Sequence, residues 1–541
     1  MILSGNAKTV SHSSRPRVPF AFRPAPVLLS LLCFFLCWAA LFLLSPSIPL
    51  ARAGSAPSLR IALIPLRAPS RMYRDFLPLK HALEQRLQRS IDLEVVRKNS
   101  KIAGLFKAGK IDIAFVCPTL YCELRRQTPV VPLVRLRLNG RDYYRSVLVV
   151  RRDSPITRAA DLMDRSLVYG RHSCPGSGLL PRIMLQRLGL SDDDFFEVVK
   201  LGNDESALLA VMARMFDVTG VPEMAVHSLA GNSLRILRYS EPIPQYLFVA
   251  RQGLGPEFVR TLKRVMLEIG QAPDRKALIG SIEEGVDGFT DARDSDYDIV
   301  RVLIDSLDPG RHTSLQPGEP ALVVEPLYYG ADLFRRLKPM LSRLRQETGT
   351  RYQLRIPRDI EEFLAMQAQG RGDLYLQEAS LFEHSRRPGD VLFGPVAVLP
   401  PALNRGLILV RSGGAVQGPA DLRGRKIAVP SLLSEGGYLA QDRLLAQQGV
   451  RLEPGQMVRM GTCEQVVMAV YRGKVDAGFV TLDALRRLEG DLDPGRLKIL
   501  ARTPPLQEWL LTGRAGIPET LQKGIRDTLR TIAHPAASGQ P

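Results

Sequence analysis

The 541-residue sequence predicts an α/β protein made of two tandem copies of one unit, each with mostly parallel sheets flanked by helices, after an N-terminal apolar segment. Three observations predict this class. Apolar stretches of four to seven residues alternate with amphipathic stretches such as 75–89 and 257–269, the pattern of β-α-β units. The chain repeats itself after residue 58. Apolar residues make up 45% and charged residues 24%, which excludes a disordered or fibrous protein.

The N-terminus is typical of an export signal. Residues 27–44 form a mostly apolar run, and the residues before it include several arginines and no carboxylate. Ala51-Arg52-Ala53 then fits the small-x-small pattern of a cleavage site. The same run also reaches the length that spans a bilayer. We therefore expect residues 1–53 to be either a cleaved signal peptide or a retained membrane anchor, and both place the remaining chain outside the cytoplasm.

Self-similarity between the two halves is the most informative feature. The strand and turn around Asp112 match those around Asp373, 261 residues later. Three further pairs keep this register within two residues: Pro65 with Pro326, Arg145 with Arg405, and Asp217 with Asp476. We expect Asp112, Asp217 and Asp476 to be structural turn or cap residues.

The repeat sets the expected domains. Module 1 covers residues 59–305 and module 2 covers residues 321–535. Residues 306–320 lie between them and are rich in proline and glycine, which predicts a linker. Ligands bind beyond the carboxyl ends of the strands in sheets of this kind, so the loops at those ends are the candidate sites.

Charge and cysteine usage exclude several function classes. The net charge of +18 is spread over single or paired basic residues without a long basic run, so we expect no nucleic-acid partner. Cys117 and Cys122 are too far apart for a CxxC pair. A disulfide among Cys117, Cys122 and Cys174 and free buried thiols both fit the sequence. We predict no metal or cofactor, and because the common hydrolase, protease and nucleotide-binding motifs are missing, we expect binding rather than catalysis.

A turn containing glycine is the candidate ligand site of module 1. Pro175-Gly-Ser-Gly178 follows an apolar strand and opens a helical pattern. Such a turn points backbone N–H groups and the positive end of a helix at an anion, with Ser177 and Gly178 as the expected donors. Further contacts are expected from neighbouring loops, namely from Thr119, Tyr121, His172 and Asn203. Tyr121 also fits a helix residue packed on the sheet, and the segment around Asn203 also fits a helix cap.

These segments resemble the PhnD-like family of periplasmic phosphonate-, phosphate- and phosphite-binding proteins. The resemblance rests on the strand and turn Gly109-Lys-Ile-Asp-Ile-Ala-Phe-Val-Cys-Pro118, on Asp142-Tyr-Tyr-Arg145 and on Ala160-Asp-Leu162. Pro175-Gly-Ser-Gly-Leu-Leu-Pro181 stands in place of the family's S-T-S-G-Y-x-x-P. The resemblance covers nearly all of both modules. It implies the type II periplasmic-binding-protein fold, in which two lobes close on a ligand.

Both modules depart from the family pattern. In module 1, Pro175-Gly176 replaces two hydroxyl residues, which removes two donors. Module 2 reads Ser434-Glu435-Gly436-Gly437-Tyr438 at the same place, so we expect the carboxylate of Glu435 to sit where an anion would bind. The candidate ligand residues of module 2 are Ser434, Gly436, Gly437 and Tyr438, and its ligand is a zwitterion, an amine or nothing.

The resemblance implies an exported solute-binding protein. It would capture a small oxyanion, similar to phosphonate or phosphate, between two lobes and present it to an ABC importer. Its partners would be the anionic ligand and the membrane subunits of that transporter, or another membrane protein. The alternative is a membrane-anchored periplasmic ligand sensor or interaction protein without a transport role, which a retained anchor would favour.

Overall fold

The computed structural model describes residues 58–64, 66–96, 98–171, 174–229, 231–307 and 319–533. The predicted export segment, most of the predicted linker and His172 lie outside these ranges. Within them, no helix combines the length and the apolarity that crossing a membrane requires.

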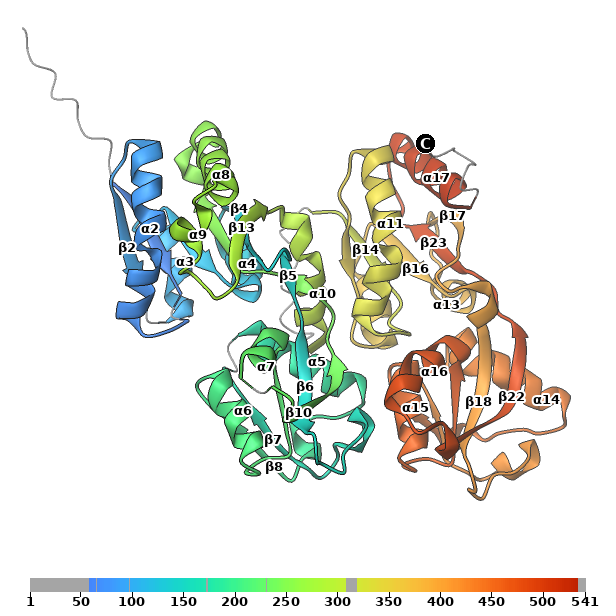
Figure 1. Ribbon diagram of the computed structural model, residues 1–541. Coiled ribbons are helices and arrows are strands. Elements are labelled where there is room, and N and C mark those ends of the chain that lie inside the picture. The colour runs from blue at the N-terminus through green and yellow to red at the C-terminus, as the bar shows by residue number, and fades with distance from the viewer. Residues whose placement is uncertain are drawn as a thin grey trace, which may run out of the picture. The chain divides into compact units, whose positions relative to one another are not determined.

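The first lobe of module 1, lobe 1A, is a six-stranded sheet in the order β13-β4-β12-β3-β1-β2 (Figure 1). β1 pairs in parallel with β2 and β3, whereas β12, β4 and β13 pair antiparallel. The central strand β3 is apolar and buried throughout because helices cover it. The strands are β1 (Leu59–Leu63), β2 (Ile91–Val95), β3 (Ile113–Val116), β4 (Val130–Leu138), β12 (Leu247–Arg251) and β13 (Val286–Asp291). The helices are α2 (Pro69–Leu87), α3 (Ile102–Lys107), α4 (Pro118–Gln127), α8 (Pro256–Gln271) and α9 (Arg275–Ile279).

The second lobe of module 1, lobe 1B, is a five-stranded sheet in the order β10-β6-β9-β7-β8. Its strands are β6 (Ser146–Arg151), β7 (Ser166–Tyr169), β8 (Glu197–Lys200), β9 (Val218–Pro222) and β10 (Leu234–Tyr239). Its helices are α5 (Leu180–Arg187), α6 (Asp204–Met212) and α7 (Glu223–Leu229). The chain crosses between the lobes twice, and β5 (Tyr143–Tyr144) pairs antiparallel with β11 (Ile243–Pro244) at the crossing. This two-stranded ribbon, called the hinge ribbon below, connects the two lobes. α10 (Asp298–Leu307) contacts both α4 and α5.

Module 2 repeats this plan. Lobe 2A has the sheet order β15-β14-β16-β23-β17 and lobe 2B has the order β20-β19-β21-β18-β22, which match lobes 1A and 1B except that no strand takes the place of β13 (Figure 1). Lobe 2A contains β14 (Ala321–Val324), β15 (Gln353–Arg355), β16 (Leu374–Gln377), β17 (Val391–Val396), β23 (Trp509–Gly513), α11 (Gly330–Thr348), α12 (Ile360–Ala368), α13 (Ala379–Ser385) and α17 (Glu519–Ala533). Lobe 2B contains β18 (Arg405–Arg411), β19 (Ile427–Val429), β20 (Met457–Arg459), β21 (Ala477–Thr481), β22 (Leu497–Pro505), α14 (Ala440–Gln447), α15 (Cys463–Tyr471) and α16 (Leu482–Leu488).

The duplication extends to single hydrogen bonds. Asp112 accepts a backbone N–H of β1 at 2.9 Å, and Asp373 accepts one of β14 at 3.0 Å. Asp217 accepts a backbone N–H of β7 at 3.0 Å, and Asp476 accepts one just before β19 at 3.0 Å. Each carboxylate holds the start of a neighbouring strand, which is the structural role that the sequence predicts.

The sheets are more mixed than the sequence predicts. In lobe 1B, β7 pairs in parallel with β8 and β9, whereas β6 pairs antiparallel with β9 and β10. The antiparallel pairs involve the strands next to the crossings between lobes: β6 directly follows the crossing into lobe 1B, and β12 directly follows the crossing back into lobe 1A. The α/β lobes are as predicted, but parallel pairing is confined to part of each sheet.

Candidate ligand-binding clefts

A cavity of about 580 Å³ lies between the two lobes of module 1. This size suits a small organic ligand. Three aromatic side chains form part of its wall: Phe115 at the end of β3, Tyr246 after the hinge ribbon and Tyr144 within it. Neighbouring rings are stacked, with centroids 5.8 Å and 6.4 Å apart. The hydroxyl of Tyr144 is buried and has no hydrogen-bond partner within the part of the chain that the structure describes. The cavity therefore has an aromatic wall that carries the hydroxyl of Tyr144.

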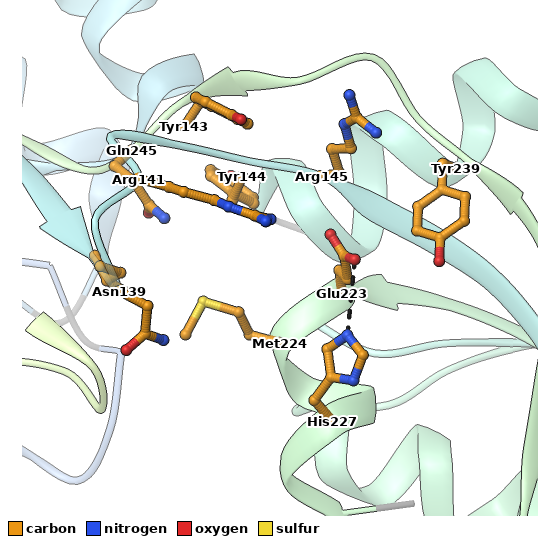
Figure 2. Close-up of a pocket in the computed structure, with 11 residues that line it drawn as sticks. Asn139, Arg141, Tyr143, Tyr144, Arg145, Glu223, Met224, His227, Tyr239 and Gln245 are labelled. Atoms are coloured by element: carbon orange, nitrogen blue, oxygen red, sulfur yellow. Dashed lines mark ion pairs between the residues drawn. The ribbon is translucent and has the colours of Figure 1, made fainter. Parts of the chain in front are cut away.

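A second hollow, of about 740 Å³, shares Tyr144 with the cavity and lies beside the hinge ribbon (Figure 2). Arg141 and Arg145 line it from the crossing segment. Glu223 and His227 of α7 line it as well and form an ion pair when the imidazole is protonated, with 3.7 Å between nitrogen and oxygen. Charges of both signs thus line the opening of the cleft.

The predicted turn of module 1, called the first glycine turn, comprises Pro175–Leu179 between β7 and α5. Gly176 lines the cavity, and its backbone N–H has no hydrogen-bond partner among the described residues. A Cβ added at Gly176 would lie 2.6 Å from Cγ of Pro222, so this position requires glycine. The amide of Gly178 is used inside the turn, since it donates to the carbonyl of Cys174 at 2.9 Å. In the described part of the chain, the amide of Gly176 therefore remains unpartnered on the cavity wall, and Gly176 is not one of the predicted ligand residues.

Ser177 and Asn203 are engaged within lobe 1B. The hydroxyl of Ser177 is buried and donates to Asp204 at 2.6 Å. The same carboxylate oxygen accepts the amide of Arg171 at 2.9 Å. Asn203 caps α6 by accepting the amide of Ser206 at 2.7 Å, the second of the two roles that its segment fits. Both side chains thus form hydrogen bonds within lobe 1B.

Thr119 and Tyr121 lie on α4, outside the residues that line the cavity. Tyr121 is fully buried, and its hydroxyl donates to Asp294 at 2.5 Å. Its burial and the adjacent carboxylate hold its pKa far above the usual range. Oγ1 of Thr119 lies 3.3 Å from Sγ of Cys117. Tyr121 therefore packs on the sheet, the alternative that the sequence leaves open.

The charges around the cavity are of both signs. Arg67 pairs with Asp75 at 3.4 Å and with Glu283 at 2.6 Å. Burial raises the pKa of Glu283, although Arg67 opposes this shift. Asp204 and Glu205 at the start of α6 also line the cavity, and Asp204 accepts the hydroxyl of Ser177 in the first glycine turn at 2.6 Å. The unpartnered amide of Gly176 thus favours an anion, whereas the carboxylate of Glu205 favours a cationic group.

The described cysteines are free thiols. Cys117, Cys122 and Cys463 are buried, whereas Cys174 is partly exposed and lines the cavity. Burial raises the pKa of Cys174 to about 12. The sequence fits both a disulfide among Cys117, Cys122 and Cys174 and free thiols, and in the structure these thiols are free.

In module 2 the equivalent turn, the second glycine turn, comprises Glu435–Leu439 between β19 and α14. It holds the carboxylate of Glu378, the residue that precedes α13 in lobe 2A. One carboxylate oxygen accepts the hydroxyl of Ser434 at 2.9 Å and the amide of Glu435 at 2.7 Å, and the other accepts the amide of Gly436 at 2.9 Å. Glu378 is 4% exposed. Ser434 and Gly436 thus bind a carboxylate that belongs to the chain itself.

Gly437 and Tyr438 contribute to the fold of lobe 2B. The amide of Gly437 donates to the hydroxyl of Ser434 at 3.0 Å. A Cβ at Gly437 would lie 2.1 Å from Cγ of Pro430, so only glycine fits. The ring of Tyr438 stacks on Phe479 with centroids 6.4 Å apart and belongs to the core of the lobe.

The expectation that Glu435 supplies the carboxylate at the anion position is wrong. Its side chain pairs with Arg443 of α14, and the carboxylate at that position comes from Glu378, 57 residues earlier. The repeat register relates this residue to module 1, because Glu378 lies as many residues after Asp373 as Cys117 lies after Asp112. The residue pattern of lobe 2B alone gives no signal for Glu378, because this carboxylate belongs to lobe 2A.

Comparisons with known proteins agree with the duplicated architecture. The sequence profile of the family described as "ABC transporter, phosphonate, periplasmic substrate-binding protein" matches residues 61–297 and 322–541. PhnD1 from Prochlorococcus marinus, solved in complex with methylphosphonate, is 17% identical with a TM-score of 0.41, covering 46% of this chain and 98% of that one. A binding protein component of an ABC phosphonate transporter from Pseudomonas aeruginosa is 16% identical with a TM-score of 0.41, covering 54% and 98%. The BvgS periplasmic domain from B. pertussis is 15% identical with a TM-score of 0.30, covering 88% of each chain.

Proposed function

The chain belongs to the phosphonate-binding family of periplasmic ABC-transporter substrate-binding proteins, and on this premise we propose that module 1 captures a small organic oxyanion between its lobes and presents it to the membrane subunits of an ABC importer. The ligand class follows from the donors of the cleft, and the delivery step follows from the family. Binding, rather than chemical conversion, is the output.

One observation carries this proposal. Gly176 lines the cavity and its amide has no hydrogen-bond partner among the described residues, while the structurally equivalent amide of Gly436 in module 2 holds a carboxylate at 2.9 Å. Each of these residues is the second of its glycine turn. Module 2 therefore supports the idea that such a turn binds a negatively charged oxygen, and module 1 offers the same donor to a solute.

The remainder of the cavity suggests what the oxyanion is attached to. The stacked rings of Phe115, Tyr246 and Tyr144 favour an apolar body, because burying apolar surface is favourable. Glu205 favours a cationic group on the same molecule, whereas Glu283 is already paired with Arg67 at 2.6 Å. We therefore place aminophosphonates and amino acids with an apolar side chain above inorganic phosphate among candidate ligands.

Closure would link binding to delivery. The ribbon of β5 and β11 joins the lobes, so a ligand that contacts both lobes stabilises the closed form by the free energy of contacts made only when the cleft is shut. One contact between the lobes exists already: the guanidinium of Arg171 donates to the carbonyl of Leu66 at 2.6 Å. A transporter that contacts both lobes would then distinguish loaded from empty protein.

The test is a thermal-shift screen of the full chain with methylphosphonate, 2-aminoethylphosphonate, phosphate, sulfonates and amino acids. Tyr144→Phe removes only the unpartnered hydroxyl, so we expect unchanged stability of the free protein and about tenfold weaker ligand binding. Gly176→Ala should abolish the shift, whereas Gly104→Ala, with nothing within 4 Å of the added Cβ, should retain it. A ligand that shifts the Gly176→Ala protein as it shifts the wild type would exclude this site.

Export is the second part of the proposal. The family is periplasmic, and we propose that residues 1–53 deliver the chain across the inner membrane. Cleavage after Ala53 would give a mature chain that begins at Gly54, whereas a retained segment 27–44 would anchor it. N-terminal sequencing of the exported protein distinguishes the two, and an unprocessed protein that stays in the cytoplasm would contradict both.

A further inference from the structure

The carboxylate of Glu378 connects the two lobes of module 2. Glu378 follows β16 in lobe 2A, whereas its three donors belong to Ser434, Glu435 and Gly436 in lobe 2B. Both carboxylate oxygens are used, at distances of 2.7–2.9 Å. These are the lengths of hydrogen bonds to a charged acceptor. The contact is therefore a complete carboxylate-binding arrangement within one chain.

The place where this carboxylate sits has the construction of an anion site. The second glycine turn continues into α14, so its N–H groups and the positive end of the helix point at Glu378. The side chain of Gln441 is fully buried and fixes the turn by donating to the carbonyl of Gly436 at 2.8 Å. A Cβ at Gly436 would lie 3.1 Å from Oε1 of Glu378, so the close approach of the carboxylate depends on glycine.

A second buried carboxyl group lies beside the first. The amide of Glu378 donates to Glu325 at 2.7 Å, and both side chains are almost fully buried. Burial and the adjacent Glu378 hold the pKa of Glu325 well above its usual range. Burial also raises the pKa of Glu378, to about 7, but the amides and the hydroxyl that donate to it oppose this shift. Glu378 is thus the more acidic of the two and is ionised in mildly alkaline solution.

We propose that module 2 carries its own ligand: the side chain of Glu378 occupies the anion site of the module, and this site binds a free small monocarboxylate such as acetate only when that side chain is removed. The lobes are then held together without a solute. Other contacts between the lobes fit this state: Tyr328 donates to Thr481 at 3.1 Å, and Ser380 donates to the carbonyl of Leu433 at 3.1 Å. The inference concerns module 2 alone and holds whatever module 1 binds.

Chemical rescue of a truncated side chain tests the proposal. Glu378→Gly in the full chain should lower the melting temperature and speed hydrogen exchange in the peptide that contains residues 434–439. Acetate at pH 8 should reverse both effects with a saturable dependence on concentration, and methylammonium at equal ionic strength should not. In the wild type, acetate should change neither the melting temperature nor the exchange of that peptide, because Glu378 already fills the site.

A matched control removes another carboxylate that links the same lobes. Glu361 of α12 pairs with Arg459 at 2.9 Å, but both side chains are about 60% exposed and no glycine turn surrounds them. Glu361→Ala should change stability little and should not respond to acetate. An acetate response equal in Glu361→Ala and Glu378→Gly, or no response in Glu378→Gly, would overturn the proposal.

A second variant decides the matter if the Glu378→Gly chain fails to fold. Glu378→Gln keeps the size of the side chain but replaces one oxygen by an NH2 group, which meets the donors of the turn instead of accepting from them. At pH 8 it should be clearly less stable than the wild type, with faster exchange at residues 434–439. A Glu378→Gln protein as stable and as protected as the wild type would show that the turn does not hold a carboxylate as its ligand.

Discussion

Cys117 and Glu378 occupy the same position in the two modules, 261 residues apart. Each directly follows the third strand of its lobe, β3 or β16, and precedes the next helix, α4 or α13. In module 2 this residue carries the carboxylate that fills the glycine turn, whereas in module 1 it is a buried thiol beside an open cavity. One side chain therefore accounts for much of the difference between a filled and an open site.

Cys117→Glu should make module 1 resemble module 2. The new carboxylate would be placed to accept the unpartnered amide of Gly176, as Glu378 accepts that of Gly436. We expect a ligand that stabilises the wild type to lose its thermal shift in this variant, and Cys117→Ala to retain it. Isothermal titration with the best ligand of the screen measures the affinity. Unchanged affinity in Cys117→Glu would mean that the two turns are not equivalent.

Tyr121→Phe separates a structural role from a ligand role. The phenol donates to Asp294 at 2.5 Å and packs edge-on against Tyr297, with centroids 4.7 Å apart. Loss of this buried hydrogen bond to a charged acceptor should cost about 1–3 kcal/mol of unfolding free energy. Ligand affinity should stay the same, because the side chain does not line the cavity. Denaturant unfolding and titration together check both parts, and a loss of affinity with full stability would restore Tyr121 as a ligand residue.

Cys174 should be the slowly reactive thiol of the cleft. It lines the cavity, and burial raises its pKa to about 12, so little thiolate exists near neutral pH. Alkylation by iodoacetamide should therefore accelerate as the pH rises towards 10 and slow when ligand is bound. Cys122 and Cys463 are buried and should react only on unfolding. Peptide mass spectrometry gives the rate at each site, and equal labelling of Cys122 and Cys174 in the native protein would contradict this account.

The fold could be predicted largely from the sequence because its signals are local and repeated. Asp112 and Asp373 stand at matching turns next to matching strands, and each holds its neighbouring strand by one hydrogen bond. The alternation of apolar strands with amphipathic helices then predicts lobes of the α/β class. The direction of the returning strands was not predictable from this alternation, because it depends on where the chain crosses between lobes.

The site was only partly predictable because its contacts are distant in sequence. The glycine turn was found from its own residues, but the partner of Ser177 is 27 residues away and the partner of Tyr121 is 173 residues away. From local spacing, Ser177 was predicted to be a free donor and Tyr121 a ligand contact. In the structure, long-range hydrogen bonds hold both side chains. The carboxylate of Glu378 arrives from the opposite lobe and was missed for the same reason.

Glu464 predicts how the stability of the chain changes with pH. Its side chain at the start of α15 is fully buried, and its burial and the charge of Asp332 raise its pKa to about 7, above about 4.3 in an unfolded chain. Between these values the folded state binds more protons than the unfolded state. Unfolding free energy should therefore fall as the pH rises through this window, by at most about 1.4 kcal/mol per pH unit for this group, and level off above pH 7. Glu378, with its pKa raised to about 7, adds a slope of the same sign.

Glu464→Gln isolates the contribution of Glu464. The amide carries no titrating proton and keeps an oxygen that can accept the amide of Tyr329, 3.5 Å away. Relative to the wild type, the variant should gain stability steadily from pH 5 to pH 7 and keep a constant advantage above pH 7. Urea unfolding at pH 5, 6, 7 and 8 provides the comparison. Because the Glu378 slope is present in both proteins, it cancels in the difference, so a difference that does not change with pH would show that Glu464 titrates in the folded chain as it does in the unfolded one.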